Sequence, residues 1–191
     1  MKTLITYHGS RNEFEAFSFD HLRSNGTDYG AGFYTTTSEA YARTFAKSKD
    51  GGRGYLYTYE FYPRKALSLT ERQISEEELA ELLLTLHETI DLLWNYDDVD
   101  YYGVEAVLNS AIQMETQSSD NDVDLINGMI NGCGDPEAVL NALHEVLGYT
   151  HIEVLDRAFG GDFYIALTPT CLNLLNCEVL QESSFGLGDD D

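Results

Sequence analysis

Residues 29–37 read Tyr-Gly-Ala-Gly-Phe-Tyr-Thr-Thr-Thr, a glycine-rich turn that runs directly into aromatic and β-branched residues. Glycine adopts the backbone conformations of tight turns, and aromatic and threonine side chains favour strands. The stretch therefore predicts a turn followed by a β-strand. Ser38 then predicts the N-cap of a helix in which Tyr41, Ala42 and Phe45 share one face at a spacing of three to four residues.

Further strands are predicted on both sides of this stretch. Residues 3–7 read as a strand that ends at His8-Gly9-Ser10, and alternating aromatic residues predict a strand at 55–61. Two more strands are expected near the C-terminus, at 150–155 and 163–167. Strands far apart in the sequence must then pair in one sheet, which predicts an α+β fold.

The middle of the chain predicts helices, inserted at about residues 70–147. Ser75 and Glu78 form a capping box ahead of a leucine stripe that reaches Leu93. A second helix is expected at 104–116, a polar loop at 118–124, and a third helix from Asp135-Pro136 to the stop at Gly148. The 191 residues suit a single domain, 1–191, whose last residues, 186–191, form an acidic tail.

Composition excludes several classes of protein. Apolar residues make up 43% of the chain, enough for a core, and no apolar run reaches the roughly 18 residues of a membrane-spanning helix. The start of the chain does not read as a signal peptide. The 3 cysteines have no paired spacing, so a zinc site or disulfide framework is not expected and the cytoplasm is the expected compartment.

The net charge of −22 is distributed unevenly. Residues 1–66 hold nine Lys or Arg and seven acidic residues, whereas residues 67–191 hold two basic residues, Arg72 and Arg157, and 26 acids. An anion site is therefore expected in the first third. The rest of the surface should repel nucleic acid and attract a basic protein, so neither direct nucleic-acid binding nor a membrane is expected.

The motif residues resemble a known family. Residues 7–10 (Tyr-His-Gly-Ser), 30–36 (Gly-Ala-Gly-Phe-Tyr-Thr-Thr) and 40–42 (Ala-Tyr-Ala) resemble the diphtheria-toxin-like, His-Tyr-Glu class of mono-ADP-ribosyltransferases. Residues 147–169 are similar to the closing stretch of phage anti-CRISPR ADP-ribosyltransferases that modify type I-F CRISPR surveillance complexes. The resemblance implies a split β-sheet core, NAD as co-substrate and no metal.

The resemblance also implies roles for particular residues, and their chemistry fits. Gly9 can offer its backbone to the nicotinamide carboxamide, and neutral His8 can hydrogen-bond a ribose hydroxyl. Tyr34 and Tyr41 offer ring faces to the cationic nicotinamide, and Arg11 can contact phosphate. The expected NAD-binding residues are His8, Gly9, Ser10, Arg11, Tyr34, Thr35 and Tyr41, of which His8 and Tyr34 are also expected to be catalytic.

The third catalytic member of the class is a late acid that binds the ribose 2′-OH and stabilises positive charge on the ribose. Candidates are Asp156, Glu153 and Asp162. Similarity to the anti-CRISPR enzymes favours Asp156, and Glu153 is the second choice. Strand alternation allows only one of these two to face the site. An Asp where the class has Glu is a departure that shortens the reach of the carboxylate.

Each of these residues also has an ordinary structural interpretation. His8 can be a hydrogen-bonded polar residue at a strand end, Tyr34 and Tyr41 can be core, Arg11 can be a solvated surface residue and Asp156 a turn acid. The expected function is transfer of ADP-ribose from NAD to a side chain of a host bacterial protein, as in a nucleic-acid-binding CRISPR–Cas subunit. The alternatives are a non-enzymatic acidic mimic of DNA and an enzyme that only hydrolyses NAD.

Overall fold

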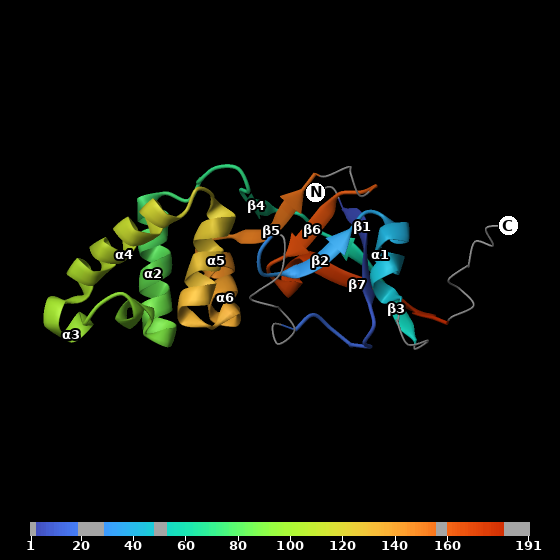
Figure 1. The fold of residues 1–191 in the computed structure, drawn as a ribbon, viewed down its shortest axis with the longest axis horizontal. Helices are drawn as coiled ribbons and strands as arrows, with labels where there is room; N and C mark the ends of the chain where they lie inside the picture. The colour runs from blue at the N-terminus through green and yellow to red at the C-terminus, as the bar shows by residue number, and fades with distance from the viewer. Residues whose placement is uncertain (1–2, 19–28, 48–52, 156–159, 182–191) are drawn as a thin grey trace.

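Seven strands from the two ends of the chain form one sheet in the order β4-β5-β6-β2-β1-β3-β7 (Figure 1). The computed structural model describes residues 3–18, 29–47, 53–155 and 160–181. The strands are β1 (Leu4–Ser10), β2 (Phe33–Thr36), β3 (Gly54–Phe61), β4 (Lys65–Leu67), β5 (Tyr149–Val154), β6 (Phe163–Ala166) and β7 (Leu172–Leu180). Neighbouring strands are antiparallel except β4 and β5, which are parallel. Strands distant in sequence therefore pair in one sheet, as expected.

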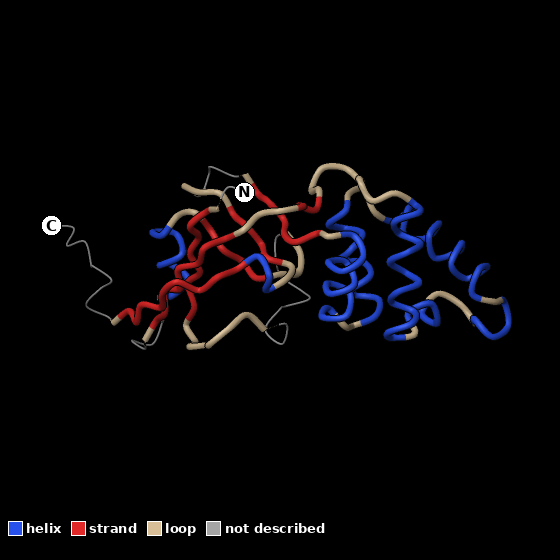
Figure 2. The backbone as a smooth tube through the Cα atoms, turned by 180° about the vertical axis from the view of Figure 1, so that it is seen from behind, coloured by secondary structure: helices blue, strands red, loops and turns tan. Residues whose placement is uncertain are grey.

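The helices between β4 and β5 lie beside the sheet, at the end formed by β4 and β5, as both backbone views show (Figures 1 and 2). They are α2 (Glu76–Ile90), α3 (Val99–Tyr102), α4 (Val104–Ser118), α5 (Asp122–Cys133) and α6 (Pro136–Leu147), with a 3₁₀ turn, η2 (Leu92–Asn95), after α2. The leucine stripe of α2 is buried with residues of α4, α5 and α6 and with Ile152 and Ile165 of the sheet. One hydrophobic core thus joins the helical layer to β5 and β6.

Buried Asp122 fixes the entry to this layer. Its carboxylate accepts hydrogen bonds from the backbone N–H groups of Ser68, Gln73 and Ile74, at 3.3, 2.8 and 3.0 Å. The carboxylate also lies in the first turn of α5, where the helix dipole favours a negative charge. A single side chain therefore ties the connection from β4 to α2 to the start of α5.

A separate helix, α1 (Glu39–Ala46), packs on the sheet across β1 and β3. Ala42 and Ala46 face Leu56 and Leu180 in a small buried cluster. The contact needs glycine on the sheet, because an ideal Cβ on Gly9 would lie 1.8 Å from the carbonyl oxygen of Ala42. The opposite face of the sheet carries a cluster of aromatic rings from β2, β3 and β6: Phe33, Tyr57, Tyr59, Phe61 and Tyr164.

Several predicted elements are confirmed. Ser38 caps α1 by accepting from the Tyr41 N–H, the capping box of Ser75 and Glu78 is present, and β3 occupies the predicted alternating stretch. The loop predicted at 118–124 was too long, because α5 begins at Asp122. In the described part of the chain, none of the helices combines the length and apolarity that crossing a membrane requires.

Four helices and strands were not predicted: α3, α5, β4 and β7. The α5 segment contains Gly128 and Gly132, which disfavour helix, yet its apolar residues are buried in the core. β7 is an edge strand whose side chains are mostly exposed, so its sequence lacks the alternation that identifies a half-buried strand.

An ion pair of Glu178 with Arg43, at 2.6 Å, ties β7 to α1.

Candidate functional site

The site begins where β1 and β2 separate. The two strands pair at Tyr7 and Thr36, after which β1 continues to Ser10 along β3 and β2 lies along β6. Beyond this pair, His8 reaches across with its side chain: Nδ1 lies 2.7 Å from the carbonyl oxygen of Tyr34. A side chain thus bridges the two strands where their ladder stops.

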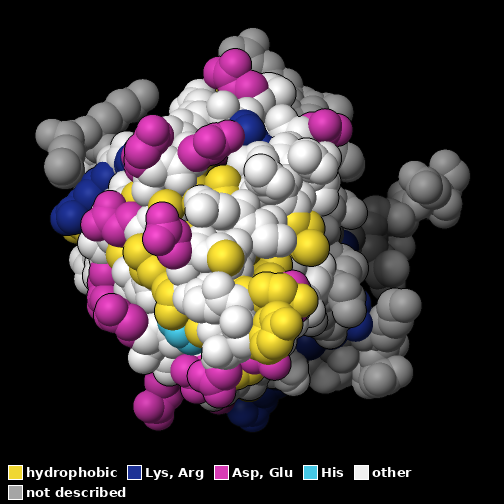
Figure 3. Space-filling model, turned by 90° about the vertical axis from the view of Figure 1, so that its left-hand side faces the viewer, with side chains coloured by type: hydrophobic (Ala, Val, Ile, Leu, Met, Phe, Trp, Pro, Cys, Tyr) yellow, Lys and Arg dark blue, Asp and Glu magenta, His cyan; other side chains and the backbone are white. Residues whose placement is uncertain are grey.

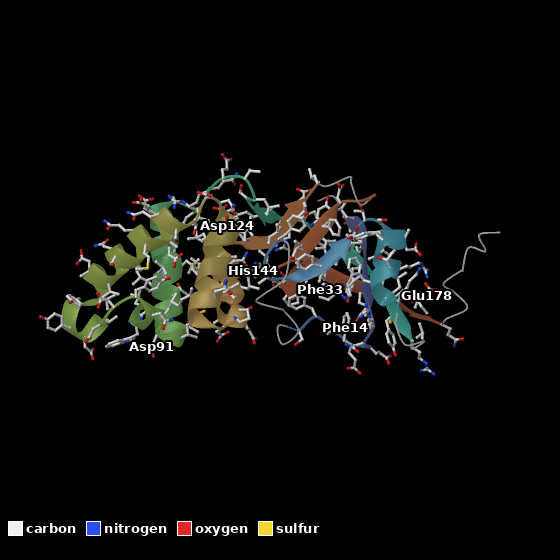
Figure 4. All side chains as sticks on the ribbon, viewed as in Figure 1. Phe14, Phe33, Asp91, Asp124, His144 and Glu178 are labelled. Atoms are coloured by element: carbon white, nitrogen blue, oxygen red, sulfur yellow. The ribbon has the colours of Figure 1, made fainter. Side chains whose placement is uncertain are left out.

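The environment of His8 sets its protonation. Its ring stacks on Phe33 with centroids 4.4 Å apart, and Phe14 meets it edge-on at 5.6 Å. Burial lowers the pKa of His8 below its ordinary value of 6.5, so the imidazole is neutral at pH 7. Because a carbonyl only accepts, Nδ1 carries the proton and Nε2 is an acceptor; the described residues give Nε2 no hydrogen-bond partner. Figure 4 labels Phe14 and Phe33 in the strand-rich half of the molecule.

The rings of Tyr34 and Tyr41 lie on the other face of the sheet. Phe33 belongs to the aromatic cluster that contacts His8, whereas its neighbour Tyr34 packs against the core of the helical layer. Tyr41 of α1 meets Phe163 of β6 edge-on, with centroids 5.4 Å apart. His8 therefore contacts Tyr34 through the Tyr34 carbonyl alone. The rings of Tyr34 and Tyr41 lie on the other face of the sheet from the His8 side chain.

The Tyr34 hydroxyl holds the glycine turn. It donates to the carbonyl of Gly30 at 2.8 Å and accepts from the N–H of Tyr29 at 3.2 Å. On its other side, the turn contacts the helical layer: the N–H of Ala31 donates to Asn127 Oδ1, at 3.0 Å. Gly30 has a φ of +96°, and an ideal Cβ there would lie 2.4 Å from the Asn127 amide nitrogen, so the turn requires glycine.

Asn127 was not predicted from the sequence. The hydrogen bond spans 96 positions, and an asparagine within α5 has no local pattern that identifies its partner. The contact makes α5 part of the structure that shapes the site.

The remaining expected NAD-binding residues have identifiable partners. Ser10 Oγ donates to the carbonyl of Asn12 at 2.8 Å, and Arg11 Nε donates to the carbonyl of Lys47 at 3.1 Å on the exposed surface. Thr35 is buried and its hydroxyl donates to the carbonyl of Tyr164 at 2.7 Å. Gly9 faces α1, as described above. Ser10 and Thr35 therefore have structural hydrogen bonds, and Arg11, which follows β1, keeps an exposed guanidinium.

Of the candidate acids, Asp156 lies outside the described residues. Glu153 on β5 is exposed and accepts a hydrogen bond from the Tyr164 hydroxyl at 2.9 Å. Pairing of Glu153 with Tyr164, and of Tyr164 with Thr35, places Glu153 on the same face as Phe33 and His8. Asp162 joins β6 to the start of α1 through its backbone, which exchanges hydrogen bonds with Thr37.

A scan against family models matches residues 4–131 to the family described as "Protein of unknown function (DUF3990)". The chain belongs to the DUF3990 family. The match includes His8, Tyr34 and Asn127 and ends before Glu153 and Asp156. The comparisons with curated proteins and with solved structures found no match.

Where β1 and β2 separate, this DUF3990 protein offers a ligand the neutral imidazole of His8 as a hydrogen-bonding group. Thr6 on β1 and Tyr59 on β3 are paired, and their buried hydroxyls find no hydrogen-bond partner among the described residues. Buried polar atoms normally form a hydrogen bond, so these two hydroxyls are expected to bind water or a polar group of a ligand. Among the described residues, no cluster of three or more His, Cys, Asp or Glu side chains is arranged to hold a metal ion.

Proposed function

We propose that this DUF3990 protein is a mono-ADP-ribosyltransferase that uses NAD as co-substrate. The observation that carries the proposal is the neutral His8, held by the Tyr34 carbonyl with Nε2 left as an acceptor at the point where β1 and β2 separate. The resemblance of the surrounding motifs to the diphtheria-toxin-like class supports the same assignment.

The residues at the divergence suit the parts of a dinucleotide. His8 Nε2 accepts a hydrogen bond from a ribose hydroxyl, and Arg11 offers a guanidinium to phosphate. Tyr34 and Tyr41 offer aromatic surface to a cationic ring on the other side of the strands, a contact of about 0.5–2 kcal/mol. When bound, NAD supplies an activated glycosidic bond whose cleavage releases nicotinamide with the bonding electron pair.

A carboxylate is still required beside the ribose, to stabilise positive charge as the C–N bond breaks and to take the proton that the acceptor side chain releases. We assign this role to Asp156, with Glu153 as the alternative. Glu153 shares a face with His8 and is exposed, and its carboxylate already accepts from Tyr164. Asp156 lies outside the described residues, so mutagenesis of each acid decides between the two assignments.

The acceptor in this proposal is a side chain of a basic host protein. The charge of the chain beyond residue 66 favours such a partner, and the similarity to phage anti-CRISPR enzymes suggests a nucleic-acid-binding subunit of a CRISPR–Cas complex. Modification there adds negative charge and bulk where DNA phosphates bind, which would block the DNA.

The test is transfer of label from NAD to protein. The full chain is incubated with NAD labelled on the ADP-ribose and with bacterial lysate, and the labelled acceptor is identified by mass spectrometry. His8→Ala should lower transfer by about 100-fold or more, the scale expected when a group acting in the transition state is lost. Asp156→Asn and Glu153→Gln separate the two acids, and Glu137→Gln, an exposed acid on α6, is the charge-matched control.

Acidic mimicry of DNA is the second candidate function, because residues 73–155 contain no Lys or Arg and many exposed acids. A mimic would inhibit a nucleic-acid-binding protein without NAD and would keep this inhibition in His8→Ala. Release of nicotinamide without any acceptor would instead indicate NAD hydrolysis. No transfer and no release, in the presence of lysate, would reject the enzymatic proposal.

A further inference from the structure

The end of the helical layer far from the sheet carries exposed aromatic and apolar side chains within a continuous segment, residues 91–105. We propose that this surface, here called the tip patch, is a docking site for a protein partner whose basic side chains surround an apolar group. The apolar members of the tip patch are Trp94, Tyr101, Tyr102 and Val104, and its acidic members are Asp91, Asp97, Asp98, Asp100 and Glu105.

The backbone beneath the tip patch is fixed by buried residues. Leu92 and Leu93 of η2 and Val99 of α3 are buried in the core of the helical layer. Asp98 caps α3 by accepting from the Tyr101 N–H at 3.0 Å. The exposed aromatic residues are therefore attached to anchored backbone, and docking there requires little ordering of the chain.

Three aromatic side chains of the tip patch are exposed to solvent over much of their surface. Tyr101, Tyr102 and Trp94 are exposed by 78%, 55% and 44%, and the rings of the two tyrosines meet edge-on at 4.7 Å. Tyr and Trp are the residues that most often dominate the binding energy of protein interfaces. Figure 3 shows this end of the molecule, with hydrophobic side chains gathered on it and acidic side chains around them.

Charge identifies the partner. The five acids of the tip patch are exposed, and the nearest basic residues in the sequence are Arg72 and Arg157. Arg72 Nη1 donates to the carbonyl of Thr116, near the end of α4. A second copy of this chain would bring the same acids, and nucleic acid or an anionic membrane would bring phosphates, so each is repelled. Lys or Arg side chains on a partner would pair with the acids and stack on the tyrosine rings. This inference does not depend on the proposed enzymatic activity.

Binding at the tip patch can be followed by intrinsic fluorescence, because Trp94 is the single tryptophan of the 191-residue sequence. The probe is a peptide of alternating arginine and leucine without aromatic residues, compared with an arginine–serine and a glutamate–leucine peptide of equal length. The arginine–leucine peptide should shift Trp94 emission to shorter wavelength and reduce its quenching by acrylamide. The arginine–serine peptide should bind at least about tenfold more weakly, the equivalent of about 1.4 kcal/mol, and the glutamate–leucine peptide should not bind.

Two variants locate the binding. Tyr101→Ser/Tyr102→Ser should raise the Kd for the arginine–leucine peptide about tenfold or more, and Asp91→Asn/Asp97→Asn/Asp100→Asn should do the same. The matched control removes three exposed acids outside the patch: Glu76→Gln, Glu77→Gln and Glu137→Gln. The inference is overturned if the control weakens binding as much as the patch variants, if a labelled peptide binds without a change in Trp94, or if Trp94 emission shifts with protein concentration alone. The last result would identify a second copy as the occupant.

Discussion

His8 shows how one residue acquires its chemistry from several parts of the chain. Its position at the end of a strand was predictable from residues 3–10. Its environment was not, because Phe14, Phe33 and the Tyr34 carbonyl approach it from other segments. The sequence pattern also could not show that the Tyr34 ring lies on the face opposite to His8, since this depends on where β1 and β2 separate.

The lowered pKa of His8 predicts a pH dependence of stability. The unfolded chain takes up a proton near the ordinary pKa of 6.5, whereas the folded chain does so only at lower pH. The free energy of unfolding should therefore fall as the pH drops below 6.5, by at most about 1.4 kcal/mol per pH unit for this group. Burial lowers the pKa of His151 as well, so its contribution has the same sign.

Urea denaturation between pH 7.5 and pH 5 checks this dependence. His8→Phe keeps a ring against Phe33 but does not titrate, so the slope of stability against pH should become shallower, and His8→Phe/His151→Phe should flatten it further. An unchanged slope in both variants would show that the two histidines are not the titrating groups.

At the scale of elements, some helices and strands are predictable from local sequence signals, and others form only because of tertiary packing. Capping residues and strong periodicity predicted α1, α2 and β3, because these signals lie within the element itself. α5 and β7 were missed because the core and the neighbouring strand β3, rather than local preference, stabilise them. The close contact of α1 with β1 is a tertiary feature whose only local trace is Gly9, which the sequence interpretation assigned to ligand binding.

Gly9→Ala tests this packing. The new Cβ would meet the Ala42 carbonyl at 1.8 Å, so α1 must move, and we expect a loss of about 1–3 kcal/mol of stability or more. Gly132→Ala on α5 is the control, since nothing lies within 4 Å of its Cβ and alanine favours helix by up to about 1 kcal/mol. Urea denaturation measures both. Equal stability of Gly9→Ala and wild type would show that α1 does not pack as described.

At the scale of the whole molecule, the helical layer and the sheet meet at the candidate site. The bond from Ala31 to Asn127 places α5 against the glycine turn, and Tyr34 connects that turn to His8 through its own backbone. The helical segment therefore supports the site at one end and carries the tip patch at the other. In Figure 4, the labelled Asp91 marks the end of α2 that leads into the patch.

Asn127→Ala tests this connection. Loss of the acceptor leaves the Ala31 N–H unpaired, which should cost about 1–3 kcal/mol of stability and, under the proposed function, raise the Kd for NAD several-fold. Asn127→Asp keeps the Oδ1 acceptor and should retain most of the affinity. Denaturation and calorimetry measure the two effects. If NAD binds Asn127→Ala as tightly as wild type, α5 does not shape the ligand site.

Isothermal titration of the full chain with NAD tests the central claim most directly. We expect one NAD per chain for the wild type. In His8→Ala, binding should weaken by about tenfold or more, which corresponds to the loss of about one hydrogen bond between neutral groups. The Glu137→Gln control should bind as the wild type does. Absence of heat with the wild type, or equal affinity in His8→Ala, would contradict the assignment of the strand divergence as a dinucleotide site.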